Sequence, residues 1–227
     1  GPDIEYVQVV DGSERYILGK DRLEHYYKDD SEYTIEWTKK GSELKGLRYE
    51  PLFPYFAYLQ DQGAFQTHNA DYVTTEDGTG IVHIAPGFGE DDYNVLKDSG
   101  LPVPVPIDAE CRFTSEVPDF EGQFVKDADK PIIAKLRDEG KLVRRENYLH
   151  PYPFCYRSHK PLIYRAISSW FVDIDKVKKS MVAANQKIRW VPGHLRDGRF
   201  GKWLEGARDW AISRNRYWGN PIPIWKC

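Results

Sequence analysis

Cysteine and methionine are scarce in this sequence, and long apolar runs are absent. The 227 residues include three cysteines and one methionine. An odd number of cysteines without a framework spacing argues against a disulfide-stapled secreted domain. It favours a reducing compartment, so we expect a cytoplasmic protein. No run of about 18 apolar residues occurs, so the sequence predicts no membrane-spanning helix.

An excess of positive charge is also missing, which argues against a wholly basic nucleic-acid-binding protein. The formal net charge is −3, but residues 1–140 carry −15 and residues 141–227 carry +12. Such asymmetry is expected where one part of a protein meets a polyanion. Two halves that neutralise each other across an interface would give the same pattern, so charge alone leaves both interpretations open.

Familiar motifs for nucleotides, nucleophiles and metals are missing as well. The glycines between positions 78 and 89 are followed by no Lys-Ser or Lys-Thr, and their spacing is not the dinucleotide fingerprint. They are expected to allow tight turns and close approach of the backbone to a ligand. No Gly-x-Ser-x-Gly elbow occurs. His150, Cys155 and His159 are poorly spaced for zinc, and Ser158 stands where a second cysteine would be needed. We therefore predict no metal and no cofactor in this chain.

The composition that remains is that of a globular protein, 41% hydrophobic and 30% charged. The residue patterns predict strands first and helices later, which indicates an α+β fold with a β-barrel or strongly bent sheet. The expected strands lie at 5–10, 14–19, 33–38 and 46–53, with two extended runs in 72–86. The expected helices lie in 90–100, 127–142 and 173–187.

Residues 78–93, GTGIVHIAPGFGEDDY, combine a glycine turn, an apolar strand-like run with one histidine, and three acids. Strand alternation puts His83 on the side opposite Val82 and Ile84, facing a cleft or solvent if those two are buried. A lone strand histidine is usually structural, and Asp92 could be a helix first-turn acid with no further role. A turn after residue 86 is expected to bring a carboxylate back near the His83 imidazole, beside a glycine-rich rim. This combination predicts a pocket for a cationic group of a ligand.

Three segments resemble the editing (connective polypeptide) domain of the isoleucyl-tRNA synthetases, a class I family. Residues 78–93 resemble its signature, and HPYPFCYRSHKPLIYRAISSWFV at 150–172 resembles a later part of the same insertion. ARDWAISRNRYWGNPIPIW at 207–225 resembles the return of the chain into the catalytic core. The resemblance covers nearly the whole chain in the right order.

The resemblance implies a β-barrel editing domain with peripheral helices at residues 3–205, followed by the return segment at 206–227. Gly1 and Pro2 are interpreted as a tag remnant and left out. The implied activity is hydrolysis of valine wrongly esterified to the isoleucine tRNA. A missing methylene in a binding pocket is worth only about 1–3 kcal/mol, a general value for which this family is itself the standard example.

The resemblance also assigns roles to site residues. Asp92 is expected to hold the α-ammonium group of the misplaced amino acid, and His83 to reject isoleucine by size. The attacking water is positioned in the pocket, with no general base named. The other expected substrate-binding residues border the terminal adenosine and the pocket rim: Thr79, Gly80, Gly87 and Phe88.

The expected partners are the acceptor end of the isoleucine tRNA carrying valine and the rest of the synthetase, in a monomer. ATP and magnesium belong by resemblance to the catalytic core outside this chain. The basic second half is expected to face tRNA phosphates. Its candidate tRNA-binding residues are Arg157, Lys160, Arg165, Lys187, Arg189 and Arg196, with Arg199 beside them.

One departure from the family affects the functional interpretation. The threonine-rich segment that lines the pocket in relatives lies upstream of this position and is not found here, which predicts a site that lacks one part. Two alternatives stay open beside the hydrolase: a non-catalytic module that binds the tRNA 3′ end, and a structural linker. Only the hydrolase is expected to lose ester hydrolysis on Asp92→Ala with its fold intact.

Overall fold

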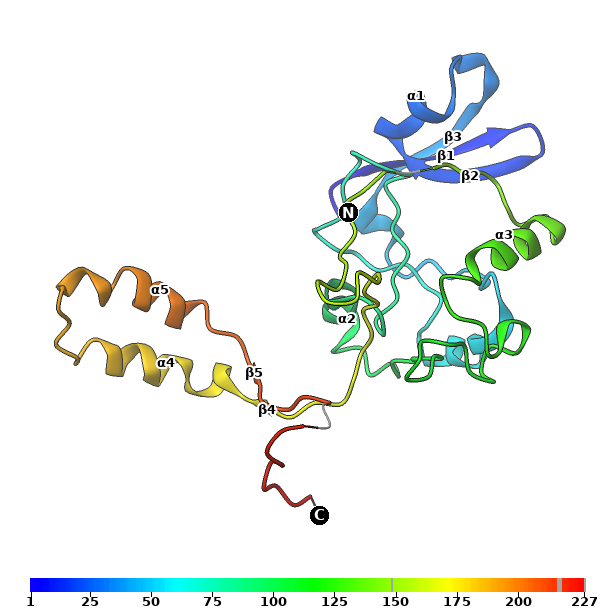
Figure 1. Cartoon of the computed structure of the whole chain (residues 1–227). Helices are drawn as coiled ribbons and strands as arrows, with labels where there is room; N and C mark the ends of the chain where they lie inside the picture. Colours follow the sequence, from blue (N-terminus) through cyan, green and yellow to red (C-terminus); the bar gives the residue numbers. More distant parts are fainter. Residues whose placement is uncertain (148, 216–217, 227) are drawn as a thin grey trace. The chain divides into compact units, whose positions relative to one another are not determined.

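The chain begins with an antiparallel sheet, in a computed structural model that describes residues 1–147, 149–215 and 218–226. The strand order is β2-β1-β3, with β1 at Glu5–Asp11, β2 at Glu14–Gly19 and β3 at Thr34–Lys40 (Figure 1). A two-residue loop joins β1 to β2, and its first residue, Gly12, has a φ of +59°. Glycine adopts this conformation at little cost. The predicted hairpin and third strand are confirmed.

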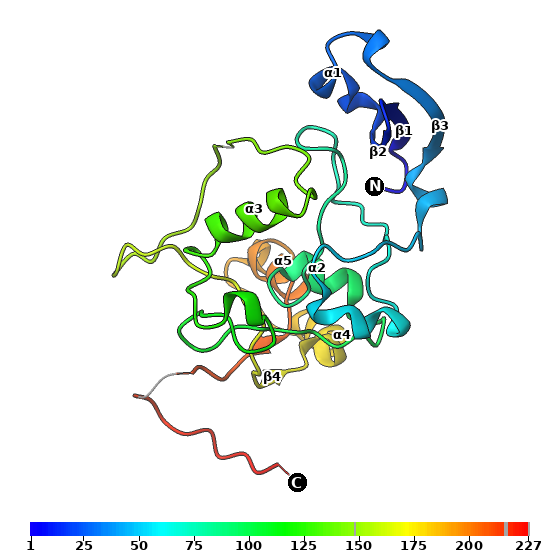
Figure 2. The same ribbon diagram turned by 90° about the vertical axis from the view of Figure 1, so that its right-hand side faces the viewer.

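The small core of this region lies between the sheet and helix α1, Leu23–Tyr26. Val7 and Val9 alternate along β1 and are fully buried, and Leu18 and Leu23 pack with them. Figure 2 shows α1 beside β1 and β2. Strand alternation therefore places one apolar face of β1 against a helix, which fixes the register of the sheet.

Residues 41–166 contain short helices joined by long irregular segments. The α-helices are α2 at Glu90–Leu96 and α3 at Asp129–Asp138, both within the predicted helical ranges. Three acids occupy the first turn of α2, as expected from the helix dipole. The 3₁₀ helices of the first 166 residues are η1 Lys20–Arg22, η2 Asp30–Glu32, η3 Gly41–Leu44, η4 Pro54–Gln62 and η5 Pro118–Phe120.

The strands predicted at 46–53 and in 72–86 are wrong for the part of the chain that the structure describes. The first range contributes a single bridge, between Arg48 and Gln66, and the second consists of turns, bends and irregular backbone with no ladder. Apolar alternation predicts an extended backbone, but a strand also needs a neighbouring strand to accept its hydrogen bonds. Among the described residues, the end of β2 gives this range one backbone hydrogen bond, from the Gly19 N–H group to the Thr79 carbonyl oxygen at 2.7 Å, and no ladder continues from it.

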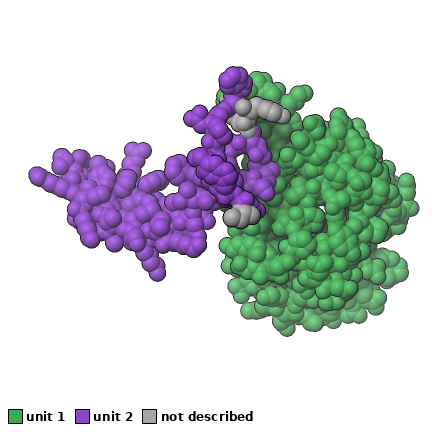
Figure 3. All heavy atoms as spheres, turned by 90° about the horizontal axis from the view of Figure 1, so that it is seen from below, with its two compact units in different colours: residues 1–166 green, residues 167–227 purple. Residues whose placement is uncertain are grey.

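Residues 167–227 form a second compact unit, coloured separately from residues 1–166 in Figure 3. It contains α4 at Ile174–Asn185, as predicted, and α5 at Arg199–Glu205, with η6 at Gly193–Leu195 between them. Asp173 caps α4 by accepting a hydrogen bond from the Lys176 N–H group at 3.2 Å.

A two-stranded ribbon closes the base of this helical pair. Strand β4, Phe171–Val172, pairs with β5, Trp210–Ala211. The ribbon thus pairs a residue range before the predicted domain boundary at 205/206 with one after it. The boundary itself stays a prediction. Residues 216, 217 and 227 of the predicted return segment lie outside the described residues.

The molecule is a mixture of helices and small open sheets, so the predicted α+β class is confirmed at that level. The finer prediction of a closed barrel stays a prediction. Among the residues that the structure describes, no helix is both long and apolar enough to cross a membrane.

Candidate functional site

A cavity of about 730 Å³ lies within the first unit, beside the segment that carries His83. Its volume falls in the range of small-molecule sites, roughly 300–1,000 Å³. Apolar and aromatic side chains form most of the wall, and no Lys, Arg, Asp or Glu side chain is among the described residues that line it. The wall is built from residues 41–73, residues 80–88 and the Pro-rich segment 101–106, with contributions from Tyr6 and Ile17. Such a lining suits an aliphatic group or a base.

The cavity brings together four of the six predicted pocket residues. His83, Gly80, Gly87 and Phe88 line it, whereas Thr79 and Asp92 stand outside the lining set. Gly87 has to be glycine here, because a Cβ atom would lie 2.5 Å from the carbonyl oxygen of Pro104. Its carbonyl oxygen also accepts a hydrogen bond from the Ala166 N–H group at 2.7 Å. The close approach at Gly87 is thus to the backbone of residue 104, and the predicted approach to a ligand stays a prediction.

The Gly78–Gly80 turn is held by the first sheet and the helix that follows it. The Gly19 N–H group donates to the Thr79 carbonyl oxygen at 2.7 Å, and the Tyr6 hydroxyl donates to the Gly80 carbonyl oxygen at 2.8 Å. Gly78 and Gly80 have φ angles of +59° and +75°. The turn that borders the cavity is therefore a fixed feature rather than a free loop.

Arg22 is the main side-chain support of this turn. Its guanidinium donates to the Gly78 carbonyl oxygen at 2.7 Å, and to those of Glu76 and Thr75 at 3.0 and 3.5 Å. No motif marks Arg22 for this role, because it lies more than fifty positions before the turn it supports.

His83 stands on an irregular segment rather than on a strand, so the predicted strand setting is corrected. Val82 is 48% exposed and Ile84 is half-buried, so they do not form the buried face that alternation predicted. His83 itself is exposed and borders the cavity. The reason is the missing neighbour strand, which leaves both faces of residues 81–84 partly open.

Asp92 is the third residue of α2, and its carboxylate points back to the cavity wall. Oδ2 accepts a hydrogen bond from the Ala85 N–H group at 3.0 Å, and Oδ1 accepts one from the Tyr72 hydroxyl at 3.2 Å. A Cβ atom on Gly89 would lie 2.7 Å from Oδ2, so glycine leaves room for the carboxylate. The chain therefore does bring the Asp92 carboxylate back to the segment that carries His83. The contact is with Ala85, two residues after the histidine.

Tyr72 and His68 are cavity residues that the sequence reasoning missed. Burial, followed by the neighbouring carboxylate of Asp92, raises the pKa of the Tyr72 phenol above its ordinary value. Burial, followed by Lys45, lowers the pKa of His68, which favours a neutral imidazole in the wall. Neither residue carries a motif, and only the folded chain brings them to the cavity.

The first three predicted tRNA-binding residues lie in the first unit. Arg157 and Lys160 are exposed on a tight turn, and the Arg157 guanidinium lies 5.2 Å from the ring centre of Tyr156. Arg165 is half-buried, and its guanidinium donates to the Asp108 carbonyl oxygen at 2.5 Å. Arg165 thus has a structural bond, whereas the other two cations face solvent.

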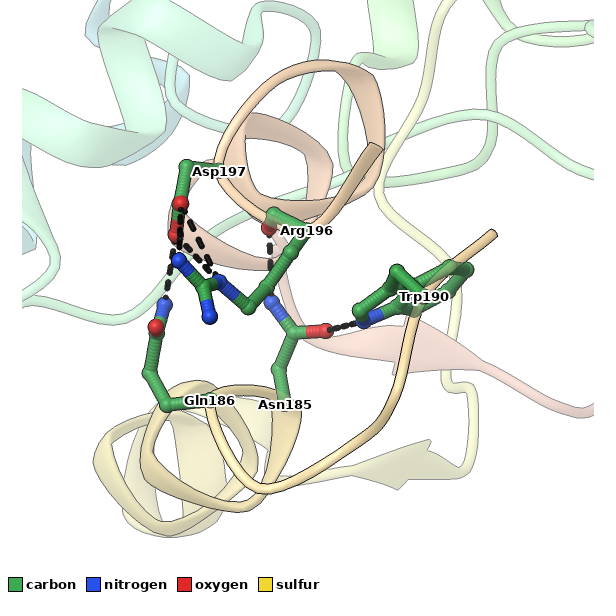
Figure 4. Close-up of polar contacts among 5 residues, drawn as sticks. All are labelled: Asn185, Gln186, Trp190, Arg196 and Asp197. Carbon is green, nitrogen blue, oxygen red and sulfur yellow. Dashed lines mark hydrogen bonds and ion pairs between the residues drawn. The ribbon is translucent and has the colours of Figure 1, made fainter. Parts of the chain in front are cut away.

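The remaining three lie in the second unit. Lys187 and Arg189 are exposed after α4, whereas Arg196 is half-buried. Arg196 forms an ion pair with Asp197 at 2.9 Å, and its carbonyl oxygen accepts a hydrogen bond from Asn185 (Figure 4). Arg196 therefore helps to hold the loop after α4 in addition to any contact with a polyanion.

The Cys155–Ser158 turn resembles half of a zinc knuckle without its second cysteine. Hydrogen bonds from the Ser158 hydroxyl, then from the Ser158 and Arg157 backbone, lower the pKa of the Cys155 thiol to about 7. Among the described residues, no group of three His, Cys, Asp or Glu side chains could hold a metal ion.

Comparison with known proteins gives the family. A model described as class I tRNA synthetases (I, L, M and V) matches residues 18–227. The chain is 57% identical to an isoleucine–tRNA ligase of Treponema denticola, 54% identical to one of Bdellovibrio bacteriovorus and 50% identical to one of Chlamydia muridarum. These alignments cover 99–100% of this chain and 22% of each relative.

The first two residues belong to the aligned sequence, because the Treponema denticola alignment covers 100% of the chain. They are also built into the fold. The Pro2 carbonyl oxygen accepts a hydrogen bond from Ser42 at 2.9 Å, and Gly1 lines the cavity. The interpretation of Gly1 and Pro2 as a tag remnant is therefore wrong. The chain spans about a fifth of the length of the relatives that it matches, and it belongs to the class I tRNA synthetases of the isoleucine, leucine, methionine and valine group.

Proposed function

We propose that this chain carries the post-transfer editing site of an isoleucine–tRNA ligase and hydrolyses valine esterified to the isoleucine tRNA. One observation supports this most directly. The carboxylate of Asp92 is hydrogen-bonded to two residues of an apolar cavity, Ala85 and Tyr72. An acidic acceptor for the α-ammonium group, beside an apolar wall for the aliphatic side chain, matches the two parts of an aliphatic amino acid.

In this proposal each part of the ester meets a matching group. Asp92 pairs with the α-ammonium group, and the aliphatic side chain enters the apolar cavity next to His83. The terminal adenosine lies along Thr79 and Gly80, whose turn is held by Tyr6 and Gly19. Gly87 and Phe88 form the rim. His83 limits the size of the side chain, so that valine enters and isoleucine does not.

The reaction itself needs one water molecule. The water oxygen adds to the ester carbonyl carbon, the bond from that carbon to the ribose oxygen breaks, and free valine and tRNA leave. A proton passes from the water to the leaving ribose oxygen. No residue of this chain is assigned as the general base, and no step uses ATP or magnesium, which the family employs elsewhere for tRNA charging.

We propose that the site also includes a threonine-rich segment of the longer family members, as the family resemblance implies. Ile81 and Val82 are 49% and 48% exposed beside the cavity, and the backbone of residues 81–84 has no ladder partner within the described chain. An unpaired edge with exposed apolar side chains is usually covered in a folded protein. We propose that the upstream threonine-rich segment covers it, and that the closed barrel forms there.

The proposed partners follow from the same assignment. They are the acceptor end of the isoleucine tRNA, bound through exposed cations such as Arg157, Lys160, Lys187 and Arg189, and the rest of the ligase chain. We propose a monomer that works in the cytoplasm. The exposed position of His83 favours one alternative, a module that binds the tRNA 3′ end without cleaving it.

Hydrolysis of two esters separates these possibilities. We would incubate valyl- and isoleucyl-tRNA, both on the isoleucine tRNA, with this chain and with a version that includes the preceding residues of the parent protein. Cleavage of the valyl ester alone is expected, faster with the extended version. His83→Ala is expected to begin cleaving the isoleucyl ester. Tight binding without cleavage by both versions would support the non-catalytic module instead.

A further inference from the structure

Among the residues that the structure describes, Tyr72 is the side chain that donates a hydrogen bond to the Asp92 carboxylate. Its hydroxyl donates to Asp92 Oδ1 at 3.2 Å across twenty positions of sequence. Its ring is 40% exposed and forms part of the cavity wall.

The contact matters because the terminal torsion of an aspartate is soft. Rotation about the bond to a carboxylate is broad rather than confined to three wells. In Asp92 each oxygen has one donor, the Ala85 N–H group on Oδ2 and the Tyr72 hydroxyl on Oδ1. Two donors on two oxygens fix the plane of the carboxylate. An ionised carboxylate has about four acceptor sites, so each oxygen keeps capacity for a ligand.

We propose that Tyr72 is a positioning residue of the amino-acid site, which orients the Asp92 carboxylate toward the α-ammonium group of the ligand. This inference rests on the proposed function, because it assumes that Asp92 binds that group. Burial and the nearby carboxylate raise the pKa of the phenol, so that the hydroxyl keeps the proton it donates.

The test compares two ligands that differ only in the group that Asp92 would bind. The first is adenosine carrying valine on its ribose through an amide, which cannot be cleaved as an ester. The second has a hydroxyl in place of the α-amino group. Dissociation constants for both are measured by calorimetry on the full-length ligase. Tyr72→Phe is expected to weaken the amino ligand about tenfold, the effect of losing one hydrogen bond to a charged group. The affinity for the hydroxy ligand is expected to stay unchanged.

Two further variants make the result decisive. Asp92→Asn is expected to weaken the amino ligand more than Tyr72→Phe and to spare the hydroxy ligand. Tyr58→Phe removes the hydroxyl of a tyrosine that is 65% exposed and outside the cavity lining, and it should change neither constant. Equal weakening of both ligands by Tyr72→Phe, or no weakening of either, would overturn the positioning role while Asp92→Asn still discriminates. If Asp92→Asn does not discriminate, the proposed ammonium site itself is wrong, and the inference falls with it.

Discussion

The carboxylate of Asp92 has a structural role, as a hydrogen-bond acceptor for the loop, and a proposed chemical role, as the partner of an α-ammonium group. A suitable substitution separates the two roles. Its Oδ2 atom holds the Ala85 N–H group at 3.0 Å, so truncation to alanine would release the loop as well as the charge. Asparagine keeps an oxygen acceptor for one of the two donors but removes the charge. Asp92→Asn is therefore the sharper variant, since a loss of activity would then report the missing carboxylate rather than a displaced loop.

A second acid–phenol contact makes the stability of the fold depend on pH. The Tyr55 hydroxyl donates to Asp119 Oδ2 at 2.7 Å, and Asp119 also pairs with Lys135 at 3.1 Å. Burial, followed by the hydrogen bond to Asp119, raises the pKa of Tyr55 to about 12. A folded-state pKa above the unfolded value means that the stabilisation is complete below about pH 10 and is lost as the pH rises through the folded pKa.

We therefore expect the free energy of unfolding to fall between about pH 10 and pH 12, and to fall less steeply in Tyr55→Phe. Urea denaturation at a series of pH values measures both slopes. Because many tyrosines and lysines titrate in this range, only the difference between the two proteins bears on Tyr55. Identical slopes would contradict the assigned contact.

At the scale of elements, a buried amide joins α4 to the segment before α5. Asn185 is 2% exposed, and its Nδ2 atom donates to the Arg196 carbonyl oxygen at 2.8 Å. Its Oδ1 atom accepts from the Trp190 ring N–H group at 2.9 Å (Figure 4). One side chain thus satisfies a donor and an acceptor of the connecting loop, which neither an apolar residue nor a carboxylate can do.

Asn185→Ala is expected to destabilise the second unit by about 2 kcal/mol, because both loop groups lose their partner. Asn185→Asp should cost more, about 3 kcal/mol, because it places a charge opposite the Arg196 carbonyl oxygen. Lys187→Ala is the matched control, since Lys187 is exposed just beyond the same helix end, and its effect should stay within about 0.5 kcal/mol. Thermal unfolding followed by tryptophan fluorescence ranks the three variants by their loss of stability. A tolerated aspartate would show that the amide donor is unimportant.

Elements with their own local signals could be predicted from the sequence, and elements that depend on distant partners could not. The β1–β2 hairpin follows from Gly12, and α4 follows from its apolar spacing and its cap at Asp173. Residues 81–84 have the same apolar alternation as a strand, yet no described strand pairs with them. The same limit applies to the site. The 78–93 segment could be singled out, but the supports Arg22 and Tyr72 approach it only in the fold.

At the scale of the whole molecule, the uneven charge is the feature that bears on tRNA. The basic second half leaves Lys187 and Arg189 exposed, whereas Arg165 and Arg196 have bonds inside their own units. Exposed cations that contact phosphates release counterions on binding, and each such contact adds about 0.9 to the dependence of log K on log salt.

We predict that Lys187→Gln and Arg189→Gln each weaken tRNA binding and reduce the salt slope by about 1. Lys176→Gln makes the same charge change in the same unit, but Lys176 is paired with Asp173 at 2.8 Å, so its slope should not change. Filter binding of the isoleucine tRNA to the full-length ligase at several salt concentrations measures all three. A uniform change of slope in all three variants would indicate a diffuse effect of net charge and contradict these two contacts.

The central claim is that the Asp92 site removes valine from the isoleucine tRNA, and one measurement tests it most directly. The initial rate of valyl-tRNA hydrolysis is compared between the full-length ligase and its Asp92→Asn variant, with isoleucine charging measured on the same preparations. We predict that hydrolysis falls by at least about a hundredfold, the loss of a pair worth roughly 3 kcal/mol, while charging is unchanged. Hydrolysis at the unaltered rate in the variant would contradict it.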